Sequence, residues 1–329
     1  MSDAAATGKT HNIDPLRRAF YARIAPQNLG PLWEVLAGIV TKEPDTKTAA
    51  HLWPYDAVRP HLLEACELIT AEEAERRVLV LENPAFQGRS KVTRSLFSGF
   101  QIIQPGEVAP PHRHSQSALR FIIEGRGAYT SVDGERVMMT PGDFIITPSW
   151  TWHDHGNLGD GPMVWLDGLD IPMVRMFEAS FREGPEDQAA DPGAGQAAPV
   201  FSYPYADSRP AAGALELDEC HGRRLRYTNP ETGDDAMPTI ATFLSILPAG
   251  FQGAPYRATD SMVYVCVEGG GTTTIGGETF SWGPHDVFVV PSWAEHVHRS
   301  DGGEPVLFSF SDRGVQEKLG LWREQKGNK

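Results

Sequence analysis

Two pairs of histidines are the residues of this sequence whose types and spacing could support metal chemistry. His112 and His114 stand one residue apart, and His153 and His155 repeat that spacing 41 residues later (153 − 112). In a β-strand, side chains at positions i and i+2 point to one face, so each pair projects two imidazoles together. Neutral imidazole nitrogens suit first-row divalent metals. We therefore predict that His112, His114 and His153 bind a metal ion.

The segment between the histidine pairs has the pattern of short strands joined by tight turns. Gly106 precedes the first histidine by six residues, and Pro141-Gly142-Asp143 leads into an apolar run at 144–147. Asn157 follows His153 by four residues. Gly and Pro between short apolar runs are typical of β-turns. An isolated His-x-His pair more often consists of ordinary core or surface residues of a strand. The prediction of a metal site therefore depends on the surrounding pattern.

The two histidine runs resemble the two signature motifs of the cupin family. The first motif is Gly-x5-His-x-His, here from Gly106, and the second is Gly-x5-Pro-x-Gly-x2-His-x3-Asn, here ending at Asn157. Two positions depart from the pattern, since Ala118 replaces the expected Glu and Trp150 the expected Gly. Without the Glu, three neutral ligands leave the full 2+ charge on the metal and open positions for an anionic chelating substrate and a gas.

The runs HRHSQSALRF (112–121) and PGDFIITPSWTWHDHGN (141–157) resemble more narrowly the gentisate 1,2-dioxygenase family. That family includes enzymes acting on salicylate and 1-hydroxy-2-naphthoate, and the resemblance extends from about residue 10 to the C-terminus. It implies an all-β bicupin fold, with two tandem double-stranded β-helix (jelly-roll) barrels and an N-terminal helical arm. It also implies one Fe(II) per chain in the N-terminal cupin, O2 as co-substrate and a homotetramer.

The resemblance implies cleavage of an aromatic ortho-hydroxy acid between its carboxyl-bearing and hydroxyl-bearing carbons. Gentisate is the expected substrate and maleylpyruvate the product, with salicylate, a substituted salicylate or 1-hydroxy-2-naphthoate as alternatives. A metal-binding bicupin without turnover is the alternative from another class of protein. Manganese or nickel cupins that oxidise oxalate or acireductone are a third possibility, but they usually keep the glutamate that Ala118 replaces.

Strand parity places Arg120 on the same face as His112 and His114, provided that no bulge intervenes. A buried guanidinium is costly unless it meets an anion, so we expect Arg120 to bind the substrate carboxylate. Its alternative partner is an internal carboxylate such as Asp167. His155 shares the face of the third ligand, and it could hydrogen-bond or exchange a proton with the substrate or simply bond to Asp167.

The resemblance also suggests the remaining residues of the pocket. Gln101 could hydrogen-bond the substrate hydroxyl or the oxygen, and Phe97 and Gly99 would line the ring. Arg76, Arg77 and Arg94 are further carboxylate-binding candidates, although a solvated surface charge is the default interpretation for each. The predicted catalytic residues are Gln101, Arg120, His155 and Asp167, and the predicted substrate-binding residues are Arg77, Phe97, Gly99, Gln101, Arg120 and Trp150.

Composition and charge narrow the class of protein. The 329 residues suit about two domains, and the net charge of −14 argues against nucleic acid and anionic membranes as partners. Cys66, Cys220 and Cys266 form no Cys-x-x-Cys motif and are interpreted as reduced cysteines. The polar N-terminus contains no apolar signal core, and no apolar run is long enough to span a membrane. We expect a cytoplasmic protein.

Five segments follow from these patterns. Helical spacing is expected from Asp14, at 31–39, at 55–68 and after Thr70. The predicted segments are a helical arm at 1–85, a metal-binding cupin at 86–183, a linker rich in Ala, Pro, Gly and Asp at 184–213, a second cupin at 214–315 and a tail at 316–329.

The second half of the chain repeats the first. Pro291 and His296 follow Pro148 and His153 at a constant offset of 143 residues (291 − 148, 296 − 153). At the position of the His-Arg-His run, however, the repeat has Tyr256-Arg257-Ala258. His296 alone remains of the triad, with His298 beside it, and one imidazole is too few to hold a divalent ion. The second cupin is therefore predicted to be metal-free and structural.

Overall fold

The fold was analysed in a computed structural model that describes residues 14–187 and 201–327. The chain divides into two compact units, one up to Asp45 and the other from Thr46 onward. The first unit contains α1 (Pro15–Ile24), a 3-10 turn (Ala25–Gln27) and α2 (Leu32–Ile39). As predicted, α1 begins at Asp14, whose side chain accepts a hydrogen bond from the backbone N–H of Leu16 (3.0 Å).

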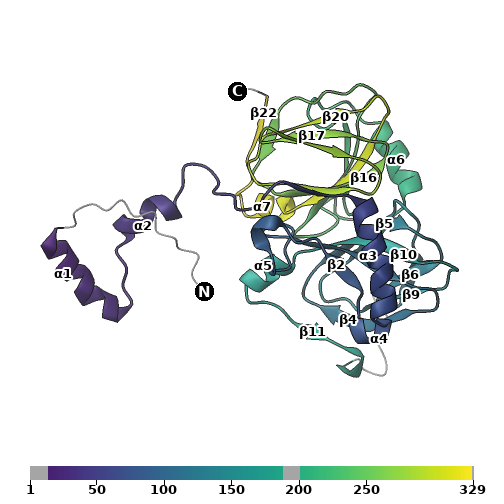
Figure 1. The fold of residues 1–329 in the computed structure, drawn as a ribbon, viewed down its shortest axis with the longest axis horizontal. Helices are drawn as coiled ribbons and strands as arrows, with labels where there is room; N and C mark the ends of the chain where they lie inside the picture. The colour runs from purple at the N-terminus through teal and green to yellow at the C-terminus, as the bar shows by residue number, and fades with distance from the viewer. Residues whose placement is uncertain (1–13, 188–200, 328–329) are drawn as a thin grey trace. The chain divides into compact units, whose positions relative to one another are not determined.

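The second unit contains two β-barrels, the first drawn in blue and teal and the second in green and yellow (Figure 1). Each barrel combines a six-stranded and a five-stranded antiparallel sheet, which confirms the all-β bicupin prediction. The first barrel has the sheets β12-β8-β5-β10-β3-β2 and β11-β4-β9-β6-β7. Its strands are β2 (Val78–Val80), β3 (Phe97–Ile103), β4 (Val108–His114), β5 (Ala118–Glu124), β6 (Ala128–Val132), β7 (Glu135–Met138), β8 (Phe144–Thr147), β9 (His153–Asn157), β10 (Met163–Leu169), β11 (Arg182–Glu183) and β12 (Ser202–Tyr203).

The second barrel repeats this plan with the sheets β1-β19-β16-β21-β14-β13 and β18-β17-β20-β15-β22. Its strands are β1 (His51–Trp53), β13 (Arg223–Arg226), β14 (Ala241–Ile246), β15 (Tyr256–Ala258), β16 (Met262–Glu268), β17 (Gly271–Ile275), β18 (Glu278–Trp282), β19 (Val287–Val290), β20 (His296–Ser300), β21 (Val306–Ser311) and β22 (Glu324–Lys326). The segment predicted as a C-terminal tail thus contains β22, which pairs with β15.

Short helices connect and flank the barrels. They are α3 (Tyr55–Leu68), α4 (Ala71–Ala74), α5 (Ile171–Met176), α6 (Tyr205–Gly213) and α7 (Arg313–Lys318), with 3-10 turns at Pro84–Phe86 and Pro185–Asp187. The helix expected after Thr70 is α4, and the Thr70 hydroxyl caps it by accepting from the N–H of Glu73 (3.1 Å). No helix in the described part of the chain is long and apolar enough to cross a membrane.

The two barrels exchange edge strands. Strand β1 precedes the first barrel in sequence but pairs with β19 of the second, whereas β12 precedes the second barrel but pairs with β8 of the first. The helix after each strand begins in the same way, because the N–H of Tyr55 donates to Asp286 (2.7 Å) and that of Tyr205 donates to Asp143 (2.9 Å). The predicted arm (1–85) therefore contributes β1 to the second barrel and β2 to the first, and the predicted linker (184–213) contributes β12 to the first. Residues 188–200 lie outside the described residues.

Two buried aspartates also join the barrels reciprocally. Asp170, at the start of α5 after the first barrel, accepts from the hydroxyl of Thr239 in the second half (2.6 Å). Asp312, at the start of α7 after the second barrel, accepts from the hydroxyl of Ser95 in the first half (2.7 Å). Burial raises the pKa of both carboxyls, that of Asp312 to about 6.

One hydrophobic core runs through both six-stranded sheets. Phe121 on β5 and Phe308 on β21 stack with ring centroids 4.3 Å apart. Gly168 on β10 permits the close approach of another ring of β21, because a Cβ at that position would lie 2.8 Å from the Phe310 ring. The six-stranded sheets therefore meet face to face, and the five-stranded sheets close the barrels on their other side.

Candidate metal centre and substrate pocket

The three predicted metal ligands of the first barrel lie together. His112 and His114 are on β4, and His153 is on β9, directly opposite His112 in the antiparallel register. Their ring centroids are 4.1, 4.9 and 5.4 Å apart. One nitrogen from each ring lies within 4.8 Å of the others, so the three side chains could hold one metal ion.

Backbone carbonyls orient two of these rings for metal binding. Nδ1 of His114 lies 2.8 Å from the Gln116 carbonyl oxygen, and Nδ1 of His153 lies 3.0 Å from that of Thr151. Because a carbonyl oxygen only accepts, each Nδ1 carries the proton and each Nε2 keeps its lone pair. Nε2 of His153 is buried and has no hydrogen-bond partner among the described residues. An orphaned buried acceptor facing two other imidazoles fits a bound cation.

Burial keeps the triad neutral at physiological pH. It lowers the pKa of His112 to about 3 and that of His114 to about 4, and it lowers the pKa of His153 well below the ordinary value. The nearby guanidinium of Arg120 acts in the same direction on all three rings. Neutral imidazoles are the form that binds metals, so no deprotonation is needed at neutral pH.

Arg120 points into the barrel, as strand parity predicted. It is 4% exposed, and its Nη1 donates to the hydroxyl of Thr147 on the neighbouring strand β8 (2.6 Å). Its Nε is 3.9 Å from a carboxylate oxygen of Asp167 and has no hydrogen-bond partner among the described residues. Arg120 is thus near Asp167 without being hydrogen-bonded to it, which leaves donors for an anionic ligand.

Asp167 accepts a hydrogen bond from Trp165 and not from Arg120. It lies opposite Arg120 in the register of β10 and β5, and it accepts from the indole N–H of Trp165 (2.9 Å). Burial raises the pKa of Asp167 to about 6, and the positive charge of Arg120 only partly offsets that effect. The carboxyl therefore titrates close to neutral pH beside the guanidinium.

His155 is buried behind the triad, on the same face of β9 as His153. The sequence left open a hydrogen bond to Asp167, but the partner of Nδ1 is the hydroxyl of Thr130 on β6 (2.8 Å). The Thr130 hydroxyl donates to the Asp154 carbonyl (3.3 Å), so its oxygen accepts from the Nδ1–H of His155. Nε2 of His155 then has a lone pair, and burial lowers the pKa of the ring well below its ordinary value.

Arg76 is a site residue for which the sequence favoured a surface role. Its Nη2 lies 2.5 Å from Nδ1 and 3.2 Å from Nε2 of His112, and it also donates to the Pro110 carbonyl (3.2 Å). Burial is the main reason that the pKa of Arg76 falls to about 10, and the like charge of Arg120 lowers it further. Arg76 and Arg120 together place two guanidinium groups at the triad.

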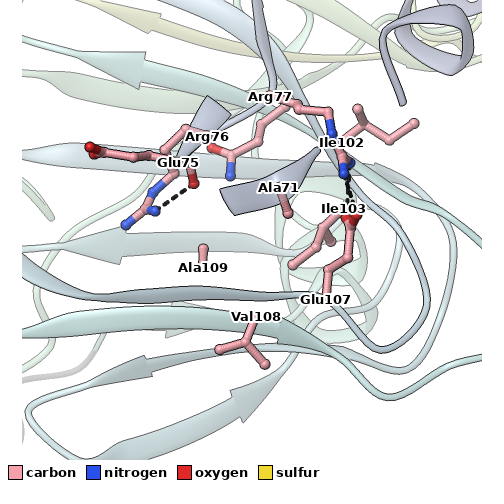
Figure 2. A pocket seen from close by; sticks show the side chains of 10 residues that line it. Ala71, Glu75, Arg76, Arg77, Ile102, Ile103, Glu107, Val108 and Ala109 are labelled. Carbon is pink, nitrogen blue, oxygen red and sulfur yellow. Dashed lines mark hydrogen bonds and ion pairs between the residues drawn. The ribbon is translucent and has the colours of Figure 1, made fainter. Parts of the chain in front are cut away.

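Arg77 differs from its neighbour. Its guanidinium forms a two-pronged ion pair with Glu107, and its Nε donates to the Ile69 carbonyl (2.9 Å). Figure 2 shows the Arg77 side chain directed at Glu107 in a shallow pocket between α4 and the β3–β4 corner. Because Glu107 neutralises its charge, the Arg77 guanidinium is used for contacts within the protein. The substrate-binding role predicted for Arg77 therefore fits Arg76 better.

The other predicted pocket residues, Phe97, Gly99 and Gln101, all lie on β3. Gln101 is buried on β3 and lines the same pocket as Arg77 and Glu107. Phe97 begins the same strand and is half-buried. Gly99 faces β2, since a Cβ there would lie 2.6 Å from the Val78 side chain and 2.9 Å from the Leu79 carbonyl oxygen. Close packing of β2 on β3 thus explains this glycine.

Two residues that the sequence offered for the pocket, Trp150 and Arg94, have exposed side chains. Trp150 adopts a left-handed turn conformation (φ 63°), is 36% exposed, and stacks with the Arg113 guanidinium 4.6 Å from its ring. Its backbone N–H donates to the His114 carbonyl (2.8 Å), so the Trp150 backbone supports a predicted metal ligand. Arg94 is exposed.

The sequence reasoning missed a second histidine cluster. His221, His296 and His298 also offer nitrogens within 4.8 Å of one another, and all three side chains are buried. The strand alignment itself was correct, because Tyr256 lies opposite His296 just as His112 lies opposite His153. His221 was missed because it comes from the turn before β13, outside both cupin motifs. The second cupin therefore contains three clustered imidazoles, more than its sequence motifs indicated.

Comparisons with known proteins agree with this geometry. Residues 99–169 and 243–311 both match the Cupin domain family. The chain is 50% identical to gentisate 1,2-dioxygenase 1 of Aquipseudomonas alcaligenes, over 94% of this chain and 96% of that protein. It is 34% identical to 5-aminosalicylate 1,2-dioxygenase of a Comamonas species, over 93% and 89% of the two chains. The crystal structure of salicylate 1,2-dioxygenase from Pseudoaminobacter salicylatoxidans with gentisate matches with a TM-score of 0.89, 30% identity and coverage of 98% and 97%.

Proposed function

Because the chain belongs to the gentisate 1,2-dioxygenase family of ring-cleaving bicupin dioxygenases, we propose that it cleaves gentisate to maleylpyruvate with Fe(II) in its first barrel. Ring opening occurs between the carboxyl-bearing and hydroxyl-bearing carbons. The observation that carries the proposal is the juxtaposition of three neutral imidazoles with the buried guanidinium of Arg120, whose Nε lacks a hydrogen-bond partner among the described residues.

His112, His114 and His153 are the residues that would hold the iron. Fe(II), when bound there, supplies open coordination positions for a chelating hydroxy acid and O2, together with the capacity to exchange electrons with them. With three neutral ligands, the protein leaves the 2+ charge of the ion to be balanced by the substrate. An ortho-hydroxy carboxylate supplies the matching negative charge and two oxygens.

Arg120 and Arg76 position the substrate carboxylate in this proposal. A buried guanidinium gains most from a carboxylate that it meets through two parallel hydrogen bonds. Thr147 fixes Arg120 through Nη1, so the direction of its remaining donors is set before the substrate arrives. Arg76 contacts a ligand histidine, so an anion held at the triad is within its reach.

His155 and Gln101 act on the hydroxyl side of the substrate. The neutral ring of His155, fixed by Thr130, offers the Nε2 lone pair to the ortho-hydroxyl proton. Its lowered pKa means that the ring accepts a hydrogen bond at neutral pH and does not add a third positive charge. Gln101, buried on β3, can donate to an oxygen of the substrate or of O2.

We further propose a cytoplasmic homotetramer that binds neither nucleic acid nor membranes. Leu32, Trp33, Leu36 and Ile39 of α2 are exposed, which supports their burial against another copy of the chain. The three cysteines are free, as in reduced cytoplasmic proteins. The net charge of −14 opposes binding to nucleic acid or to anionic lipids.

The test is anaerobic loading with Fe(II), followed by O2 uptake with gentisate, salicylate, 5-aminosalicylate and 1-hydroxy-2-naphthoate in parallel. We expect the highest kcat/KM with gentisate, growth of the absorbance of a ring-opened product, and no uptake by His112→Ala. Faster uptake with another of these acids would keep the reaction class and change the substrate. No uptake with any of them, despite iron bound at the first triad, would overturn the proposal.

A further inference from the structure

The second barrel contains three buried histidines that the proposed reaction does not use. His296 and His298 stand two residues apart on β20, so their side chains share one face of the strand. His221 reaches them from the turn before β13, with its ring centroid 6.4 Å from each of theirs. The ring centroids of His296 and His298 are 5.1 Å apart.

The turn that carries His221 is fixed by a network of its own. The Asp218 carboxylate accepts from the backbone N–H groups of Cys220 (2.8 Å) and His221 (3.0 Å). Asp218 also pairs with Lys326 on β22 (2.8 Å). The His221 ring packs edge-on against the Tyr256 ring, with centroids 4.4 Å apart. The third imidazole is therefore held by the fold and does not belong to a loose loop.

Two ring nitrogens in this cluster have their hydrogen-bonding capacity unused. Nε2 of His296 and Nε2 of His298 are buried and have no hydrogen-bond partner among the described residues. Nδ1 of His296 faces the Ala294 carbonyl at 3.3 Å, so the proton is on Nδ1 and the lone pair is on Nε2. A buried polar atom without a partner destabilises the fold, and a bound cation would remove that cost.

His298 repeats the arrangement of His155. Its Nδ1 is 2.9 Å from the hydroxyl of Thr273, which also accepts from the indole N–H of Trp282 (2.9 Å). Thr273 thus orients the His298 ring as Thr130 orients His155. A hydroxyl or carbonyl on the far nitrogen of a histidine is the usual support of a metal-binding imidazole.

The charges around the cluster do not prevent cation binding. Burial is the first reason that the pKa of His296 falls to about 4 and that those of His221 and His298 fall well below the ordinary value, so all three rings are neutral. The Arg224 guanidinium opposes a cation at this site, and the Asp260 carboxylate, which has one buried oxygen without a hydrogen-bond partner among the described residues, favours it.

We propose that His221, His296 and His298 form a second metal site, which binds a divalent first-row transition metal inside the second cupin. Three buried imidazoles, two of them with an orphaned Nε2, are a donor set that such ions select. The remaining coordination positions take water or a small anion, which also balances the 2+ charge. The site is independent of the first triad, because it uses no residue of the first barrel.

Metal stoichiometry tests the proposal directly. Protein stripped by a chelator is loaded anaerobically with Fe(II) or, separately, with Zn(II), desalted, and analysed for metal per chain by elemental mass spectrometry. We expect two equivalents in the unaltered chain, one in His153→Ala, one in His221→Ala, and none in the double variant. His61→Ala, which removes an exposed histidine on α3, is the matched control and should retain two.

Each outcome decides between one site and two. One equivalent in the unaltered chain, with none in His153→Ala, would overturn the proposal. Cobalt(II) loading gives a second readout, because the visible absorption of His221→Ala should fall to about half of that of the unaltered chain. If His221→Ala does not fold, His153→Ala still decides the question, since its second barrel is intact. O2 uptake by His221→Ala reports on the first site separately, so failure of the ring-cleavage proposal would remain distinguishable.

Discussion

Tyr264 of the second barrel occupies the register position that Arg120 occupies in the first. Arg120 lies opposite Asp167 across β5 and β10, and Tyr264 lies opposite Ser309 across β16 and β21. The charged pair of the first barrel is thus replaced by two hydroxyls, both buried without a hydrogen-bond partner among the described residues. The repeat keeps the two histidines of the second motif, as His296 and His298, but not this guanidinium, so we place aromatic acid binding in the first barrel alone.

Arg120→Gln tests the role of that guanidinium. Removing one side of a buried charge pair costs about 2–5 kcal/mol, so we expect kcat/KM for gentisate to fall by about 30-fold to several thousand-fold. The iron content should not change, because Arg120 is no ligand. Arg136→Gln, which removes an exposed arginine packed on Tyr129, is the control. Equal kcat/KM values for the two variants would contradict carboxylate binding by Arg120.

Arg76→Ala and Arg77→Ala should separate binding from stability. Arg76→Ala removes a cation beside His112, and we expect a raised KM with a nearly unchanged midpoint of thermal unfolding. Arg77→Ala leaves the partly buried Glu107 without its ion-pair partner, so we expect a loss of roughly 1–3 kcal/mol in the free energy of unfolding. Steady-state kinetics and urea denaturation of both variants check this; the reverse pattern would assign Arg77 to the substrate.

Thr130→Val and Thr273→Val are matched changes in the two barrels. Each removes the hydroxyl that orients a histidine, His155 in the first barrel and His298 in the second. Loss of such a support typically costs about 10- to 100-fold in activity or metal affinity. We expect Thr130→Val to lower kcat for gentisate, and Thr273→Val to weaken metal retention in the second barrel while turnover persists. Equal effects of the two variants on kcat would argue against separate roles.

Asp312 should make stability depend on pH. Its pKa in the folded chain is about 6, above the ordinary 3.8, so the folded state binds the proton more tightly than the unfolded state does. Its stabilising contribution is therefore complete below about pH 4 and is lost as the pH rises through 6. Asp312→Asn removes this loss, so the free energy of unfolding of the variant, relative to that of the unaltered chain, should rise by about 1–2 kcal/mol from pH 5 to pH 8.

Urea denaturation at the two pH values measures this difference. Asp301→Asn, at an exposed position, is the control and should show no such change. Comparing each variant with itself across pH cancels the constant cost of altering the hydrogen bonds to Ser95 and Ser261. A pH-independent difference for Asp312→Asn would mean that this carboxyl titrates normally in the folded protein.

Gly99→Ala should disturb the edge of the first barrel. The added methyl would lie 2.6 Å from the Val78 side chain and 2.9 Å from a carbonyl oxygen, so β2 must shift. Overpacking of this kind costs about 1–3 kcal/mol in the free energy of unfolding. Because Arg76 lies just before β2, we also expect an altered KM. Gly134→Ala, in a turn with open space around it but a positive φ (84°), is a comparison that should change stability without changing KM.

The sequence was sufficient for the parts of the site that local patterns determine. The period of two along β4 and β5 placed His112, His114 and Arg120 on one face, and the Pro-Gly turn fixed the return to His153. Contacts that depend on segments outside those motifs were not predictable in this way. Arg76 reaches His112 from the residues before β2, and its distance from the motifs in sequence made a surface role the natural interpretation.

Local sequence patterns also could not show that β1 and β12, in the segments predicted as an arm and a linker, pair with strands of the barrels. Strand β1 is three residues long and β12 is two, too short to show an alternating pattern. Their pairing partners are set by which edge of which sheet is open, and that is a property of the assembled barrels. His221 belongs to this group, because the turn that carries it is defined by contacts with Asp218 and β22.

The exchange of β1 and β12 has a consequence for how the chain can be divided. Cutting it between the two cupin matches would leave each fragment with a strand that belongs to the other and with an uncovered sheet edge, at β8 in one fragment and β19 in the other. Uncovered edges are templates for pairing with further chains. We therefore expect the isolated halves to aggregate, and the co-expressed halves to reassemble into a complementing pair held by mutual strand donation.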